Sequence, residues 1–394
     1  DQRNQFDLYR DMPGGLTTLR GVADSIRMMG AKFFIAYNPW DESTRSEGHL
    51  KGLRYLIQET SADGVVLDTK GESSKELQET ADQVRNGVIM YSEGMAVPKD
   101  MQGIISGRVH NALYYPPLLN LNKFIRPDFA IFRVAEVFKE PIQREYAVAF
   151  FNGYGTEINQ FAPGHPQWEE EQYLGKTTRI LRENTTAFTQ TYTPLIPTLR
   201  DSVWVNKWQD SAHKKILYTI LSFNPAGFSS LLFEIETSGN RVIDLWKHEE
   251  AIVTKRNNKH YVQVNINGFD SRFLGTNNEG EVSCIAVFNK EVNFLVNGNR
   301  LAGPASRNEI RIWMGNPDYE KQPLIINPNQ SIDLDITKSF GRYEGKLVIQ
   351  AFYENELVDE QILNLKPGVP RLISKEVKTP LSKEVPAEMV RIPG

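Results

Sequence analysis

The sequence is poor in the features that metal centres, disulfide frameworks and nucleic-acid-binding surfaces need. Its 394 residues include a single cysteine, Cys284, which excludes an intrachain disulfide, and six histidines whose scattered positions fit no zinc motif. Lys and Arg number 45 against 49 Asp and Glu, so the net charge of -4 lacks the basic excess of nucleic-acid-binding proteins. No apolar run approaches the length of about 20 residues that a membrane-spanning helix needs. We therefore expect no metal site, no cofactor, no nucleic-acid partner and no membrane span.

The chain has the composition of a globular protein with more than one domain. Hydrophobic residues make up 40% and charged residues 24% of the sequence, which is ordinary for a protein with a packed core. At roughly 150 residues per domain, the length predicts two or three domains. The chain opens with Asp1, without an initiator Met or a signal peptide, which predicts a processed or partial polypeptide.

Up to about residue 199, helical segments alternate with short apolar runs, the pattern of a parallel sheet with crossover helices. The predicted strands are 33–37, 64–68, 88–91, 112–115, 129–134 and 155–158, and the main helices are 16–29, 48–60, 73–84 and 167–188. This pattern favours a (β/α)8 barrel over residues 1–199. Since a closed barrel needs eight strands, we expect the first strands to lie upstream of Asp1.

Beyond residue 199 the sequence changes to short runs rich in Val, Ile, Tyr, Trp and Phe, separated by Asn and Gly turns. We predict a β-sandwich over 200–290 and a second small, immunoglobulin-like sandwich over 291–365, with Asn297-Gly298 as a hairpin turn. Residues 366–394 are rich in Pro and Lys and repeat Ser-Lys-Glu-Val, which predicts a linker that leads into a downstream module.

Two carboxylates end consecutive predicted strands: Asp68 and Glu93. The carboxyl ends of neighbouring parallel strands lie roughly 4.8 Å apart on one face of a barrel, so these groups can converge on one bond. Retaining glycoside hydrolases need a nucleophilic carboxylate and an acid/base carboxylate about 5–5.5 Å apart. The positions therefore favour a retaining glycosidase pair. The same residue types also fit loop caps or surface acids, and both interpretations stay open at this point.

Further residues are predicted to surround the sugar. Trp40 can stack on a sugar ring and Asp41 can bind hydroxyls, although Asn38-Pro39-Trp40-Asp41 also fits a turn with a packed indole. Tyr37 and His110 are candidates for the wall of the site, as is Tyr91. The glycine-rich segment 152–157 is predicted to be a loop that brings Glu157 or Asn159 to the barrel mouth.

Four segments in order resemble a known family: Tyr37-Asn38-Pro39-Trp40-Asp41, Ala62-Asp63-Gly64-Val65-Val66-Leu67-Asp68-Thr69, Tyr91-Ser92-Glu93-Gly94 and Ala149-Phe150-Phe151-Asn152-Gly153. They are similar to the glycoside-hydrolase-like (β/α)8 barrels of bacterial multidomain proteins that precede a formylglycine-generating-enzyme (sulfatase-modifying-factor) domain. The resemblance spans roughly residues 1–288, and residues 388–394 look like the opening of that downstream domain. Relatives resemble a Trp-Glu-Asn segment after Asn152-Gly153, where this chain has Thr156-Glu157-Ile158-Asn159-Gln160-Phe161.

The resemblance implies a nucleophilic role for Asp68 and an acid/base role for Glu93, with a carbohydrate substrate. It also implies the bacterial periplasm or cell surface as the location, with protein partners in an outer-membrane or cell-surface complex. Two functions follow from the sequence: a retaining glycoside hydrolase, or a catalytically inactive barrel that serves as a scaffold or glycan-binding subunit of a cell-envelope assembly. The missing indole near Glu157 favours the second.

Overall fold

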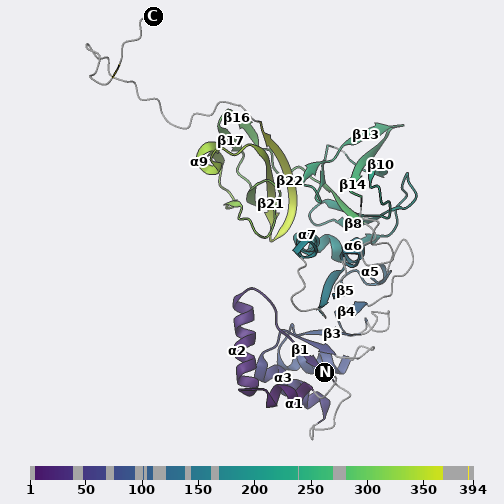
Figure 1. The fold of residues 1–394 in the computed structure, drawn as a ribbon, viewed down its shortest axis with the longest axis vertical. Helices are drawn as coiled ribbons and strands as arrows, with labels where there is room; N and C mark the ends of the chain where they lie inside the picture. The colour runs from purple at the N-terminus through teal and green to yellow at the C-terminus, as the bar shows by residue number, and fades with distance from the viewer. Residues whose placement is uncertain are drawn as a thin grey trace, which may run out of the picture.

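The computed structural model describes residues 5–38, 48–67, 75–93, 101, 104–109, 121–137, 143–160, 168–237, 239–268, 281–366 and 389. It has a mixed α/β fold in which a curled parallel sheet forms half a barrel and several antiparallel sheets follow it (Figure 1). The predicted alternation of helices and parallel strands is confirmed, whereas closure of an eight-stranded barrel stays a prediction. No helix in the described part of the chain is long and apolar enough to cross a membrane.

The parallel sheet has the strand order β1-β2-β3-β4-β5-β6. Its strands are β1 (Phe34–Tyr37), β2 (Gly64–Leu67), β3 (Ile89–Ser92), β4 (Ser106–Val109), β5 (Ala130–Val137) and β6 (Gly155–Gln160). The helices of this region are α1 (Gln5–Asp11), α2 (Gly15–Met28), α3 (His49–Thr60), α4 (Lys75–Val84), α5 (Asn122–Ile125), α6 (Gln143–Phe151), α7 (Trp168–Glu183) and α8 (Thr185–Thr189). The predicted strand 112–115 lies outside the described residues, and β4 was not predicted.

The two faces of the parallel sheet have different surroundings. Side chains alternate between the faces, and one set, which includes Ile35, Val65 and Met90, is buried against apolar residues of α3 and α4 such as Leu53 and Leu77. We call this the outer face. The opposite set forms the inner face, where Phe34 and Val66 are only half-buried.

Two aromatic rings of the inner face lie across glycines on neighbouring strands. A Cβ atom placed on Gly64 would come within 2.5 Å of the Phe34 ring, and one on Gly155 within 2.6 Å of the Phe132 ring. Any larger residue at either glycine would displace the ring beside it. The glycines therefore allow the rings to lie flat and leave room above the sheet for polar side chains.

The free edge of β1 is covered by α1. The Tyr9 hydroxyl donates to the Ala36 carbonyl over 2.9 Å, and it lies 2.8 Å from the Ala36 amide nitrogen, which donates to it. The amide and carbonyl groups of a residue in a parallel strand point to the same side of the strand. Those of Ala36 point away from β2, toward the open edge of the sheet. A further strand that paired with β1 at this position would have to displace Tyr9.

The segment 152–157 is a turn followed by a strand rather than a loop. Helix α6 ends at Phe151, and Gly153 has φ of +65°, a left-handed conformation that ends the helix. A Cβ atom at Gly153 would lie 2.8 Å from the Trp208 ring, so packing also requires glycine there. Glu157 thus lies on β6, and the regular strand sets its direction.

The predicted helix 167–188 is two helices, α7 and α8, with a break at Asn184. The side-chain Nδ2 atom of Asn184 donates to the Ile180 carbonyl over 2.9 Å, while the side-chain Oδ1 atom accepts from Lys215 at the same distance. Since this contact is to a residue far along the chain, local sequence pattern did not reveal the break. It turns α8 so that the Thr186 amide donates to Glu356 over 2.9 Å.

The β-rich region after α8 contains a six-stranded sheet of order β12-β11-β15-β9-β8-β7 and a three-stranded sheet of order β10-β14-β13. The strands are β7 (Thr191–Thr193), β8 (Val203–Asp210), β9 (Lys215–Ser222), β10 (Phe228–Ile235), β11 (Arg241–Asp244), β12 (Glu249–Glu250), β13 (Val253–Arg256), β14 (Lys259–Ile266) and β15 (Glu281–Phe288). Strand β9 is covered on both faces, because Leu217 and Leu221 pack against the helices while Tyr218 and Ile220 pack toward the smaller sheet.

The last region contains a three-stranded sheet of order β16-β17-β20 and a four-stranded sheet of order β19-β18-β21-β22. Its elements are β16 (Leu295–Asn297), β17 (Arg300–Gly303), β18 (Glu309–Met314), β19 (Leu324–Ile326), β20 (Ile332–Asp335), α9 (Ile336–Phe340), β21 (Gly345–Tyr353) and β22 (Glu356–Leu365). The two sheets share one apolar core. The predicted boundaries at residues 199, 290 and 365 stay predictions, although β7 already pairs with β8.

Strand β22 joins the last region to the rest of the protein through buried acidic side chains. Glu356 accepts from Lys215 over 3.0 Å, and Asp359 pairs with Arg241. Glu360 accepts from His248 Nδ1 over 2.8 Å. Because a buried charge is costly without a partner, these contacts specify how β22 docks. Figure 1 shows β22 beside α7 at this junction.

We expect Lys215→Met to destabilise the junction strongly. The Lys215 side chain is fully buried, and its loss would leave the Glu356 carboxylate without its cation. Breaking a buried ion pair from one side costs about 3–5 kcal/mol. Urea unfolding should show this loss, while the exposed control Lys338→Met should change the free energy of unfolding by less than about 0.5 kcal/mol. Equal effects of the two substitutions would contradict the assignment.

The His248 contact predicts a pH-dependent stability. Burial, with a smaller effect from the nearby Arg179, lowers the pKa of His248 below its usual 6.5 although Glu360 opposes this. The unfolded chain therefore takes up a proton below about pH 6.5 that the folded protein resists, and the free energy of unfolding should fall by up to about 1.4 kcal/mol per pH unit.

The comparison of wild type with His248→Gln at pH 7.5 and pH 5.0 isolates this contribution. Burial raises the pKa of Glu183 to about 7, and this group acts in the opposite direction because the folded state gains a proton as the pH falls. Both proteins keep Glu183, so its effect cancels in the difference. Wild type should lose more stability than the variant between the two pH values; an equal loss would refute the role of His248.

Candidate functional site

A network of charged side chains lies on the inner face of the parallel sheet. The Arg108 guanidinium donates through Nη1 to Glu157 over 2.5 Å and through Nη2 to Glu93. The Tyr91 hydroxyl donates to the other oxygen of Glu157. Arg108 is 9% exposed, whereas Glu93 and Glu157 are 18% and 24% exposed. The two carboxylates therefore reach solvent while the cation between them is almost buried.

The register of the sheet brings these residues together. Ser92 pairs with Gly107, so Glu93 and Arg108 are the next residues along adjacent strands. Arg108 pairs with Phe132, and Phe132 pairs with Gly155, two residues before Glu157. Since side chains alternate with a period of two, all four charged and hydroxyl groups point to the inner face. Glu93 directly follows β3 and Arg108 is the third of the four residues of β4, so both lie toward the carboxyl ends of their strands, where barrel enzymes bind substrates. Glu157 is the third of the six residues of β6.

Tyr91 is the hydroxyl donor of the network. Burial, followed by the adjacent Glu157 carboxylate, raises the pKa of Tyr91 well above its usual value of 10. The phenol thus keeps its proton at every physiological pH and donates it to Glu157. The Tyr91 ring also contacts Phe132 edge to face, with 5.7 Å between the ring centroids, which holds its orientation.

Of the predicted site residues, the structure brings Glu93 and Glu157 together. Tyr37 lies on the outer face, is 0% exposed and donates its hydroxyl to the His49 carbonyl. In this structure it is a core residue, so its predicted contact with a sugar has no structural support. Trp40, Asp41, Asp68 and His110 lie outside the described residues, and their assignments stay predictions.

Arg108 is the residue that sequence reasoning missed. It lies in Ser106-Gly107-Arg108-Val109, a strand too short and polar to give an apolar run. One feature of the sequence could have indicated this strand: Ile104, Ile105 and Val109 lie close to Arg108 and form a short segment typical of a β-strand. Arg108 Nε is buried and has no hydrogen-bond partner among the described residues, so the guanidinium is held only through its two Nη atoms.

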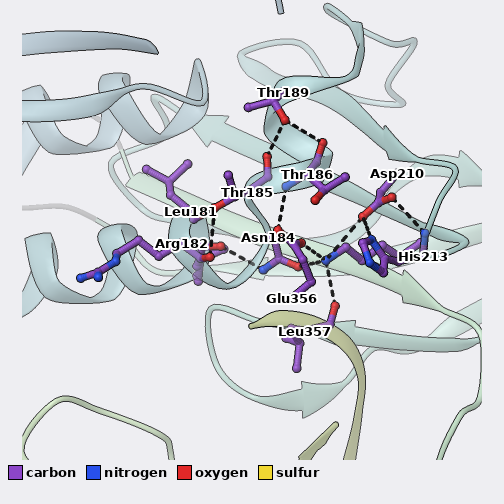
Figure 2. Close-up of polar contacts among 12 residues, drawn as sticks. Leu181, Arg182, Asn184, Thr185, Thr186, Thr189, Asp210, His213, Glu356 and Leu357 are labelled. Atoms are coloured by element: carbon purple, nitrogen blue, oxygen red, sulfur yellow. Dashed lines mark hydrogen bonds and ion pairs between the residues drawn. The ribbon is translucent and has the colours of Figure 1, made fainter. Parts of the chain in front are cut away.

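A second polar cluster has the spacing of a metal site. Asp210, His213 and Glu356 offer ligand atoms within 4.8 Å of one another, and Figure 2 shows their side chains converging near Asn184. However, the Lys215 ammonium lies 3.0 Å from Glu356 and 3.8 Å from Asp210. It supplies the positive charge that these carboxylates need, so we interpret the cluster as an ion-pair junction between β9 and β22.

Solved structures that resemble the chain are glycoside hydrolases, at low similarity. A cyclomaltodextrinase has a TM-score of 0.49 and 12% identity, with 69% of this chain and 63% of that protein covered. An α-amylase from Geobacillus thermoleovorans, solved with acarbose, has a TM-score of 0.47 and 12% identity, covering 72% and 83%. An α-fucosidase from Thermotoga maritima has a TM-score of 0.39 and 12% identity, covering 68% and 67%.

No family model and no curated protein matches the sequence. Similarity to solved structures at this level assigns neither a substrate nor an activity to the chain. The chain spans 63% of the cyclomaltodextrinase.

Arg108→Met should destabilise the protein in a pH-dependent manner. Without the guanidinium, the Glu93 and Glu157 carboxylates would lose the cation that they share, and we expect a loss of about 3 kcal/mol at pH 7. Part of this loss should be recovered near pH 4, where carboxylates take up protons. Urea unfolding at both pH values measures it, with the exposed Arg20→Met as control. A loss that is the same at both pH values would show that the charge plays no part.

Proposed function

We propose that the inner face binds a carbohydrate and that Asp68 and Glu93 hydrolyse a glycosidic bond with retention. The observation that supports this most directly is the network of Glu93, Arg108, Glu157 and Tyr91 on the inner face. Carboxylates and a guanidinium bind sugar hydroxyls, and the inner-face position agrees with the site of catalysis in barrel enzymes. The sequence resemblance supplies the same two catalytic residues.

In the proposed reaction, Asp68 attacks the anomeric carbon and Glu93 protonates the leaving oxygen; Glu93 then removes a proton from the water that hydrolyses the glycosyl intermediate. Asp68 directly follows Leu67, whose register partner Ser92 directly precedes Glu93. The two acids thus occupy equivalent positions after adjacent strands, which supports the proposed pairing.

The acid role of Glu93 needs a proton on that carboxyl group. Arg108 neutralises only one of its two carboxylate partners, so Glu93, Arg108 and Glu157 together retain one negative charge. Uptake of a single proton makes the set neutral. Glu157 can hold the Arg108 guanidinium by itself while Glu93 is protonated. Glu93 can therefore donate a proton in one step of the proposed reaction and accept one in the next.

Asp68→Asn should abolish hydrolysis, and Glu93→Gln should lower kcat by about 100- to 10,000-fold, the usual contribution of a general acid. The assays would use α-glucosides and α-fucosides, with NMR of the first-formed product to show whether the anomeric configuration is retained. Glu59→Gln, which changes an exposed acid on α3, should leave the rate unchanged. Unchanged turnover by Asp68→Asn, or an inverted product, would disprove the mechanism.

The alternative is a catalytically inactive barrel that binds glycans or serves as a scaffold in a bacterial cell-envelope assembly. The ion pairs of Arg108 with both Glu93 and Glu157 favour it, because a guanidinium stabilises the ionised carboxylate that binding uses. Wild-type protein that binds oligosaccharides by calorimetry but cleaves none of them would identify this function. The periplasmic or cell-surface location, the protein partners and the downstream formylglycine-generating-enzyme-like domain are proposals that rest on the sequence resemblance alone.

A further inference from the structure

A cavity of about 390 Å³ lies between α7 and the connection from β18 to β19. Its lining includes Lys176 and Arg179 of α7, His248, and Asn316 and Tyr319 of the connection. None of the residues of the inner-face network lines it. Its volume is within the range of about 300–1,000 Å³ of small-molecule sites, which occur preferentially where separately folded regions meet.

Arg179 brings an incompletely paired cation to this cavity. Arg179 is 5% exposed, and its Nη1 atom has no hydrogen-bond partner in the described part of the chain. Its Nη2 atom lies 2.6 Å from His248 Nε2. Because His248 Nδ1 donates to Glu360, Nε2 is the acceptor of a neutral imidazole. His248 therefore accepts a hydrogen bond from Arg179 without neutralising its charge.

Lys176 is the second cation in the lining of this cavity. Its Nζ lies 4.2 Å from the centroid of the Trp246 ring, and no carboxylate of the described residues is within ion-pair distance. Burial lowers the pKa of Lys176 to about 8, although Asp244 and Glu281 oppose the shift, so most molecules carry the charge at pH 7. Two half-satisfied cations one helical turn apart make this wall of the cavity a site for one anionic group.

The rest of the lining limits the chemistry of the anion. Tyr319 is 58% exposed. Its ring lies 3.5 Å from the position that a Cβ atom on Gly175 would take, so it packs over α7 where the helix has no side chain. The amides of Gln172 and Asn316 can bind hydroxyl groups. Three acids also line the cavity: Asp318, which pairs with Lys321 over 2.6 Å, and the exposed Glu171 and Glu320. Their negative charge disfavours a dianion such as phosphate.

We propose that this cavity binds a small hydroxylated monocarboxylate, of which a uronic acid is the simplest sugar form. The carboxylate lies between Lys176 and Arg179, the sugar ring lies against Tyr319, and the amides of Gln172 and Asn316 receive the hydroxyls. This site is separate from the inner face and does not depend on hydrolysis there.

Isothermal titration calorimetry of the whole chain tests the proposal, with D-glucuronate as the probe and D-glucose and inorganic phosphate as comparisons. Glucuronate should bind and the other two should not. Lys176→Met keeps an apolar side chain of similar length but removes the charged Nζ that lies over Trp246, and it should weaken binding about tenfold or more. Tyr319→Ala should weaken binding about three- to tenfold, and the matched control Lys338→Met should leave it unchanged.

The outcomes separate this site from the inner face. Binding that Lys176→Met weakens and Glu93→Gln leaves unchanged supports the proposal whether or not the protein hydrolyses sugars. Absence of binding by glucuronate, equal binding of glucose, tighter binding of phosphate, or an undiminished affinity of Lys176→Met would each overturn it. Circular dichroism of the two cavity variants shows that they are folded, since neither removes a hydrogen bond that the structure contains.

Discussion

A buried charge needs a partner of opposite sign, and this constraint organises the molecule at two levels. On the inner face, Arg108 is nearly buried and pairs with carboxylates from strands on either side of it in the sheet order. At the junction of the β-rich regions, Lys215 and Arg241 meet Glu356 and Asp359 of β22. In both places the partners are distant in sequence, so the pairing selects one arrangement of the strands and helices among those that apolar packing would allow.

The two faces of the parallel sheet differ in chemistry. Outer-face residues are apolar and are covered by helices, and even the Tyr37 hydroxyl bonds to backbone. The inner face keeps half-buried aromatic and charged groups, with Gly64 and Gly155 making room for flat rings. The edge of β1, where a closed barrel would continue, instead receives the Tyr9 hydroxyl. The described fold thus presents its polar network on a concave surface without requiring closure.

The junction with β22 shows how one strand can create a further surface. Burial keeps His248 neutral while Glu360 accepts a hydrogen bond from its Nδ1 atom. The neutral ring in turn accepts from Arg179 and orients it without cancelling its charge. Gln350 adds to this set by donating to Glu360 over 2.9 Å, while Trp313 donates to Gln350 at the same distance. The orientation of Arg179 in the cavity beside α7 therefore depends, through His248, on hydrogen bonds with residues of β21 and β22, far along the chain.

The sequence by itself determined the local order of the protein: where α2, α3 and α4 lie, that parallel strands come before antiparallel ones, and that Glu93 follows a strand. These features follow from periodicity and from Gly and Pro positions, which act over a few residues. Only the tertiary structure decided that Tyr37 faces the helices, that Arg108 lies between Glu93 and Glu157, and that α7 breaks at Asn184. Each of these depends on register or on a partner more than ten residues away, and a pattern with a period of two or 3.6 residues contains no information about which distant strand will be its neighbour.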